Sequence, residues 1–97
     1  AVNVRALRGR QPDSPALSRY DEVAVMLTGN PNATATDAVA WVQALCRALG
    51  IPPLSAYGVE PEDVDRLVEK AAVASSMKPN PIALTRQELR EILMQAL

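Results

Sequence analysis

The chain has 97 residues, a net charge of −1 and no histidine. Its 10 basic residues balance 11 acidic ones, which removes the electrostatic case for nucleic acid or an anionic membrane surface as a partner. Without histidine, and with Cys46 as its only cysteine, the chain cannot build a His-based acid–base site, a Ser-His-Asp or Cys-His site, or a His or multi-Cys metal site. We therefore expect no catalytic, cofactor-binding or metal-binding residue within residues 1–97, and no tightly bound iron or zinc.

Length and cysteine content also limit the class of protein and its compartment. The length suits one small domain that needs no disulfide. Cys46 has apolar neighbours, so we expect a buried and unreactive thiol, and the lack of disulfides favours the reducing cytoplasm. No run of about 18 apolar residues is present, so no membrane span is predicted. No signal-peptide pattern is present. The chain starts without Met, which predicts a piece of a longer protein or a processed product.

The first thirty or so residues predict a lead-in and one helix. Residues 1–10 have the pattern of a helix tail or of an extended lead-in, and a glycine and a proline then break it. Ser14 suits an N-cap and Pro15 the first helical position. Apolar residues follow at helical spacing until Gly29, where we expect this helix to end.

The helix predicted over residues 34–49 is apolar around most of its circumference. Thr34 and Asp37 have the spacing of a capping box, and few strongly polar residues follow them. Such a helix is expected in the middle of a bundle, with Trp41 and Val42 as its largest anchors. We therefore expect Trp41 to be mostly buried, so that Trp41→Ala would cost about 3–5 kcal/mol.

Two further helices are predicted in the second half of the chain. The prolines at 52–53 force an extended segment, and the acids of Glu60–Asp63 then favour a helix start. The prolines of Lys78–Pro81 stop that helix, and Thr85 with Glu88 forms a capping box for the last one. The expected apolar faces are Val64, Leu67, Val68, Ala71, Ala72 and Ser75 on the third helix, and Leu89, Ile92, Leu93 and Ala96 on the fourth, with Leu84 and Leu89 as a hydrophobic staple.

No stretch of alternating apolar and polar residues is long enough for a strand. The predicted fold class is therefore all-α, a small bundle of four main helices with short, proline-marked connections.

The densest acids are open to two interpretations, a cation site or a helix start with a solvated face, and we favour the second. These acids are Glu60, Glu62, Asp63, Asp65 and Glu69. The basic run over residues 5–10 is interpreted as a solvated lead-in.

Two groups of short motifs point to a family. The first is Gly50–Leu54 followed by Tyr57–Val59, and the second is Asn80-Pro81 followed by Leu84-Thr85 near the end of the chain. Their order and spacing, over residues 20–97, resemble the C-terminal end of iron-containing alcohol dehydrogenases. Pro79 departs from the pattern, because a glycine or another small residue is expected before Asn80-Pro81.

The resemblance implies a two-domain dehydrogenase with an N-terminal α/β domain that holds NAD(P) and an all-helical, dehydroquinate synthase-like C-terminal domain. A divalent iron or zinc ion would lie in the cleft, held by an Asp and several His. Residues 1–97 would then be a C-terminal helical fragment, with the metal ligands and the glycine-rich nucleotide loop upstream of residue 1. The fragment would hold no cofactor and would not be catalytic alone. Whether the Ser75–Pro81 loop borders the cleft is left open.

On this interpretation the parent enzyme would oxidise an alcohol, or reduce an aldehyde or a keto group, with NAD(P)(H). A maleylacetate reductase-like enzyme is a variant within the same family. The alternative is a stand-alone all-helical protein-interaction module. The expected partners are the missing N-terminal nucleotide-binding domain and a second copy of the chain, which would associate through the second or the first helix. No nucleic acid and no membrane is expected.

Overall fold

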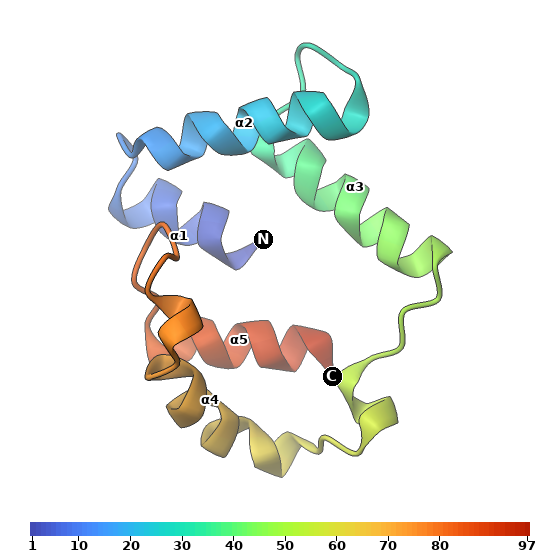
Figure 1. The fold of residues 1–97 in the computed structure, drawn as a ribbon, viewed down its shortest axis with the longest axis vertical. Coiled ribbons are helices and arrows are strands. Elements are labelled where there is room, and N and C mark those ends of the chain that lie inside the picture. Colours follow the sequence, from blue (N-terminus) through green and yellow to red (C-terminus); the bar gives the residue numbers. More distant parts are fainter. The chain divides into compact units, whose positions relative to one another are not determined.

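Five α-helices and three short 3-10 helices make up the computed structural model, which describes residues 1–97 and contains no strand (Figure 1). The predicted all-α class is confirmed, and α1 (Val2–Arg10) adds a fifth helix to the four expected. Residues 1–10 thus adopt the helical alternative, because Val4 and Leu7 lie on one face of α1 and are both buried. The chain divides into two compact units, Asn3–Ile51 and Pro52–Leu97. That residues 1–97 form a C-terminal helical fragment of a larger, two-domain dehydrogenase stays a prediction.

In the first unit, α2 (Pro15–Thr28) and α3 (Ala35–Ala48) begin and end close to where the sequence predicts. Ser14 caps α2, since its Oγ accepts a hydrogen bond from the backbone N–H of Ala16 at 3.3 Å. Gly29 ends α2 with φ of 69°, a left-handed conformation that costs glycine little.

Small side chains join α2 to the start of α3. Ala24 is fully buried and packs with Ala33 and Ala38. Asp21 on α2 reinforces this contact, because its Oδ1 accepts a hydrogen bond from the backbone N–H of Ala35 at 2.7 Å. The first turn of α3 is therefore fixed against α2 both by packing and by a charge-assisted hydrogen bond.

The second half of α3 does not lie inside a bundle, and that prediction is wrong. Trp41 is 38% exposed and Leu49 is 66% exposed, while Val42 is also exposed and Cys46 is only half-buried. The alanine contact holds only the N-terminal half of α3. The C-terminal half of α3 continues away from α2 (Figure 1). Truncating Trp41 should accordingly cost less than the roughly 3–5 kcal/mol expected for a buried tryptophan.

The second unit opens with two 3-10 helices, η1 (Leu54–Tyr57) and η2 (Pro61–Asp63), before α4 (Val64–Ala72). Gly58 ends η1 with φ of 80°, a left-handed conformation that glycine adopts at little cost. Ser55 in η1 donates a hydrogen bond from its Oγ to the backbone oxygen of Leu97 at 2.7 Å. This contact ties the last residue of the chain to the start of the unit.

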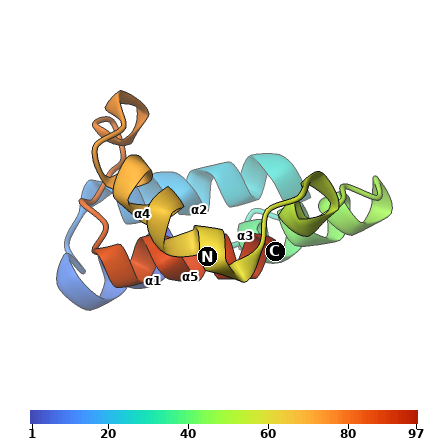
Figure 2. The same cartoon turned by 90° about the horizontal axis from the view of Figure 1, so that it is seen from below.

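The helices α4 and α5 (Arg86–Ala96) run in opposite directions and pack on each other (Figure 1 and Figure 2). Their core is a cluster of Val64, Val68 and Leu89. The half-buried residues packed against it are Ala71, Met77, Leu84, Leu93 and Leu97. Leu84 packs against the cluster that contains Leu89, as the predicted staple requires, and Val64, Val68 and Leu89 of the predicted faces are buried.

Four members of those faces are exposed, contrary to the prediction: Ala72 and Ser75 in the first face, and Ile92 and Ala96 in the second. Helix α4 ends at Ala72, several residues before the prolines, and Val73 directly after it is 82% exposed. Ser75 therefore lies outside α4 and is exposed. On α5, Ile92 is 39% exposed, since the side of the helix that bears it has no partner in the core cluster.

Removing the cap of α5 should destabilise the second unit measurably. Thr85 Oγ1 accepts a hydrogen bond from the N–H of Glu88 at 3.1 Å, and Glu88 Oε2 accepts one from the N–H of Thr85 at 2.8 Å. Thr85→Ala is expected to lower the free energy of unfolding by about 1 kcal/mol. Urea denaturation followed by circular dichroism measures this change. Thr85→Ser keeps the hydroxyl and should retain most of the stability; equal losses in both variants would contradict the capping role.

Candidate functional site

The segment between α4 and α5 contains the Asn80-Pro81 motif and projects from the end of α4 (Figure 2). A series of short-range hydrogen bonds shapes it into the 3-10 helix η3 (Ser75–Met77). The N–H of Ala74 donates to the carbonyl of Ala71, and that of Met77 to Ala74, at 3.1 and 3.0 Å. The chain therefore turns tightly directly after α4, with no long flexible connection.

Asn80 fixes the second half of this segment. Its side-chain Nδ2 donates to the carbonyl of Ile82 at 2.6 Å, and its backbone N–H donates to the carbonyl of Met77 at 3.1 Å. Pro81, between Asn80 and Ile82, has no backbone N–H and cannot donate a hydrogen bond. The side-chain amide of Asn80 is therefore the donor that shapes the turn. The motif that carries the resemblance thus has a structural role in positioning Ile82, which is buried.

A pocket of about 330 Å³ lies between the end of α4, η3 and the start of α5. Met77, Leu84 and Leu89, all members of the core cluster or packed against it, contribute to its lining. The other lining residues are Ala72, Val73, Ala74, Lys78 and Ala83. Lys78 is the one charged residue among them. This pocket could not be predicted from the sequence, because its residues come from three separate elements.

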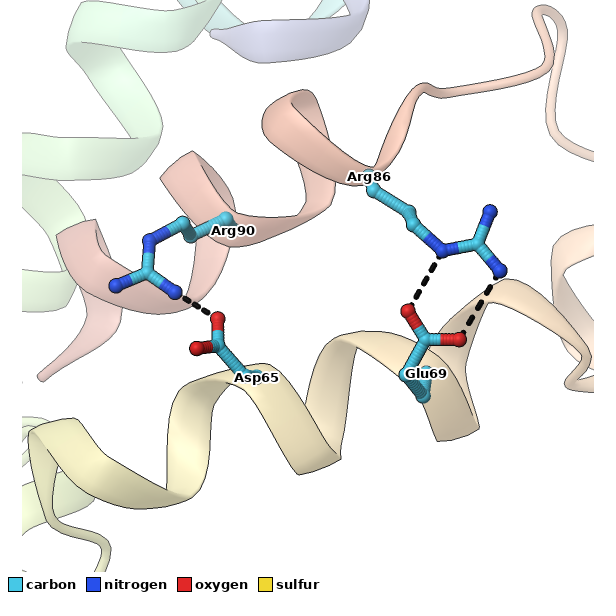
Figure 3. A network of polar contacts seen from close by, with 4 residues as sticks. All are labelled: Asp65, Glu69, Arg86 and Arg90. Atoms are coloured by element: carbon cyan, nitrogen blue, oxygen red, sulfur yellow. Dashed lines mark hydrogen bonds and ion pairs between the residues drawn. The ribbon is translucent and has the colours of Figure 1, made fainter.

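The acidic residues of α4 pair with arginines of α5 (Figure 3). Glu69 accepts two hydrogen bonds from Arg86, one from Nε at 2.6 Å and one from Nη2 at 3.0 Å, and Asp65 pairs with Arg90. Each helix contributes two residues spaced four apart, so both pairs can form in one antiparallel register. Asp65 and Glu69 of the acidic cluster therefore form a solvated ion-pairing face.

The contact between Glu69 and Arg86 shifts the pKa of both groups. The Arg86 guanidinium beside Glu69 lowers the pKa of that carboxyl, and the Glu69 carboxylate raises the pKa of Arg86. The pKa of Asp63 is lowered by the hydrogen bond from Arg66 at 2.6 Å and by the backbone N–H of Glu60 at 3.1 Å. All these groups stay charged at neutral pH, so none is suited to exchange a proton there.

Glu69→Gln should make the stability of the second unit less sensitive to acid. The lowered pKa of Glu69 means that its stabilising effect is present above the pKa of the unfolded carboxyl and is lost as pH falls through the folded pKa. The fall in melting temperature between about pH 7 and about pH 3 should therefore be smaller in the variant. Circular dichroism melts measure it. Glu62→Gln, which removes an exposed carboxylate without an ion pair, should keep the wild-type fall, and identical behaviour of the two variants would refute the assignment.

In the first unit, the basic run lies on the exposed side of α1. Arg8 donates a hydrogen bond from Nη1 to Thr36 Oγ1 at 3.3 Å, which links α1 to the first turn of α3. Another pocket, of about 250 Å³, lies at this contact and includes Arg5 and Val39 in its lining. The basic residues therefore belong to a packed helix and not to an extended lead-in.

The donor set of the chain does not fit a metal centre. The structure contains no group of three or more His, Cys, Asp or Glu side chains that could hold an ion. With no histidine and only the half-buried Cys46, the ligands that iron and zinc prefer are also missing from the composition. None of the helices has the length and apolar character needed to cross a bilayer.

Comparison with protein families finds a match that covers all but the first seven residues. Residues 8–97 match the family model described as the Fe-containing alcohol dehydrogenase family, C-terminal. Comparison with curated proteins found no match, and comparison with solved structures found none either.

Proposed function

Because the chain belongs to the Fe-containing alcohol dehydrogenase family, we propose that it forms the C-terminal helical portion of a metal-dependent, NAD(P)-linked oxidoreductase. The parent enzyme would oxidise an alcohol, or reduce an aldehyde or a keto group, and a maleylacetate reductase-like activity is included in this proposal. The observation that carries it is the family match over residues 8–97, which includes both motif groups of the second unit. The cytoplasm is the proposed compartment.

The metal and the nucleotide would be bound by residues outside this chain. The iron named in the family description needs ligands that residues 1–97 do not supply, and no glycine-rich loop is present to hold a pyrophosphate. We therefore assign no catalytic step to these residues. Their proposed role is structural: they build the helical domain against which an N-terminal nucleotide-binding domain would close.

The test compares the 97-residue chain with the product of the whole reading frame that encodes it. The longer product should interconvert alcohols and carbonyl compounds with NAD(P)(H) when Fe²⁺ or Zn²⁺ is supplied. The 97-residue chain should show no turnover and should retain no stoichiometric metal after dialysis. Metal-dependent turnover by the short chain alone would contradict the proposal. A reading frame without metal-spaced histidines upstream would favour the stand-alone interaction module.

We further propose that the chain forms a homodimer. The exposed second half of α3 supports this, because Val42, Leu45 and Leu49 lie on one face of the helix and none of them is buried. A two-fold axis lets one such face cover itself in the partner copy. The net charge of −1 gives little repulsion against association.

A further inference from the structure

The pocket of the second unit has an apolar floor that the fold does not fill. Leu84 and Leu89 form part of this floor, and both belong to the packing around the α4–α5 core cluster. Three alanines, Ala72, Ala74 and Ala83, also line the pocket, and their small side chains leave space in it. The volume of about 330 Å³ lies at the lower end of the range of roughly 300–1,000 Å³ that small-molecule sites occupy. The space therefore suits a small ligand with an apolar body.

Lys78 gives this pocket a single charge. It is exposed, it lines the pocket, and its ammonium makes no ion pair within the protein. A lysine can lay its aliphatic stem along an apolar surface while its ammonium stays in water. One ammonium matches a singly charged anion, whereas a phosphate monoester carries close to two charges and would lack a second partner.

We propose that this pocket binds a short aliphatic carboxylate, with the alkyl chain on the apolar floor and the carboxylate beside the Lys78 ammonium. The alkyl chain contributes most of the binding free energy, because burial of apolar surface scales with the area removed from water. Lys78 contributes selectivity for the anion over a neutral analogue. The pocket lies wholly within the Pro52–Leu97 unit and needs neither metal nor nucleotide, so this inference does not depend on the proposed function.

The experiment titrates the isotope-labelled 97-residue chain with octanoate and with 1-octanol, and follows methyl and amide signals by NMR. Saturable shifts are expected at Ala74, Met77 and Ala83 with both ligands. Octanoate should bind about two- to fivefold more tightly, the preference expected for one exposed ion pair. Lys78→Gln should remove that preference, whereas Lys70→Gln, on the exposed face of α4 and outside the pocket, should leave it unchanged.

Ala83→Leu tests the location, because Ala83 is exposed and its enlargement fills the pocket without touching the centre of the core. This variant should keep the wild-type spectrum elsewhere and lose binding of both ligands by at least about tenfold. Equal affinity of the wild type for octanoate and octanol would overturn the proposal. So would a preference that survives in Lys78→Gln, or saturable shifts confined to Trp41 and Leu49 on α3.

Discussion

Leu89→Ala is expected to lower the free energy of unfolding of the Pro52–Leu97 unit by about 2–5 kcal/mol. Leu89 is only 5% exposed and is the one residue of α5 in the cluster with Val64 and Val68. Its truncation removes buried apolar surface and leaves a cavity between two helices that are short and carry few other large side chains. Small domains are stable by only about 5–15 kcal/mol, so the loss is a large part of the total.

Ile92→Ala is the matched control, since Ile92 lies on the same helix but is 39% exposed. It should cost less than about 1.5 kcal/mol, because much of its side chain already faces water. Urea denaturation followed by circular dichroism gives the overall stability. Amide hydrogen exchange in α4 and α5 separates this unit from Asn3–Ile51. Similar losses in the two variants would show that the α4–α5 core is not centred on Leu89.

The helix boundaries set by local chemistry could be predicted from the sequence. The cap at Ser14, the glycine stop at Gly29 and the box of Thr85 with Glu88 all involve residues within a few positions of each other. Their hydrogen bonds form whenever the local backbone turns, whatever the rest of the chain does. The central core positions Val64 and Leu89 were predicted for the same reason, because the helical period alone places them on apolar faces.

Features that depend on which helices meet could not be predicted in this way. The sequence of α3 shows that the helix is apolar around most of its circumference. Its pattern does not show whether another helix covers that surface, and Trp41 is exposed. The pairing of Glu69 with Arg86 joins residues 17 positions apart and requires the antiparallel register of α4 and α5. The end of α4 at Ala72 was not predicted either, because the prolines expected to stop the helix lie several residues further on, after the chain has already turned into η3.

The 97-residue chain is expected to sediment as a dimer at tens of micromolar, and Leu45→Glu should make it monomeric. Leu45 lies between Val42 and Leu49 on the exposed face of α3, at the centre of the surface proposed to pair with its copy. A carboxylate there would be desolvated against the same group of the partner, so dimerisation should weaken by at least about tenfold. Sedimentation equilibrium over a range of concentrations measures the dissociation constant.

Met26→Glu distinguishes α3 from α2 as the interface. Met26 is one of the most exposed apolar residues of the first unit and lies on α2, the other helix through which association was expected. If α3 forms the contact, this variant stays dimeric, because its new carboxylate remains in water. A wild-type chain that sediments as a monomer would rule out the homodimer. Loss of the dimer in Met26→Glu but not in Leu45→Glu would instead assign the interface to α2, because a charge disrupts association only where it is buried by the partner.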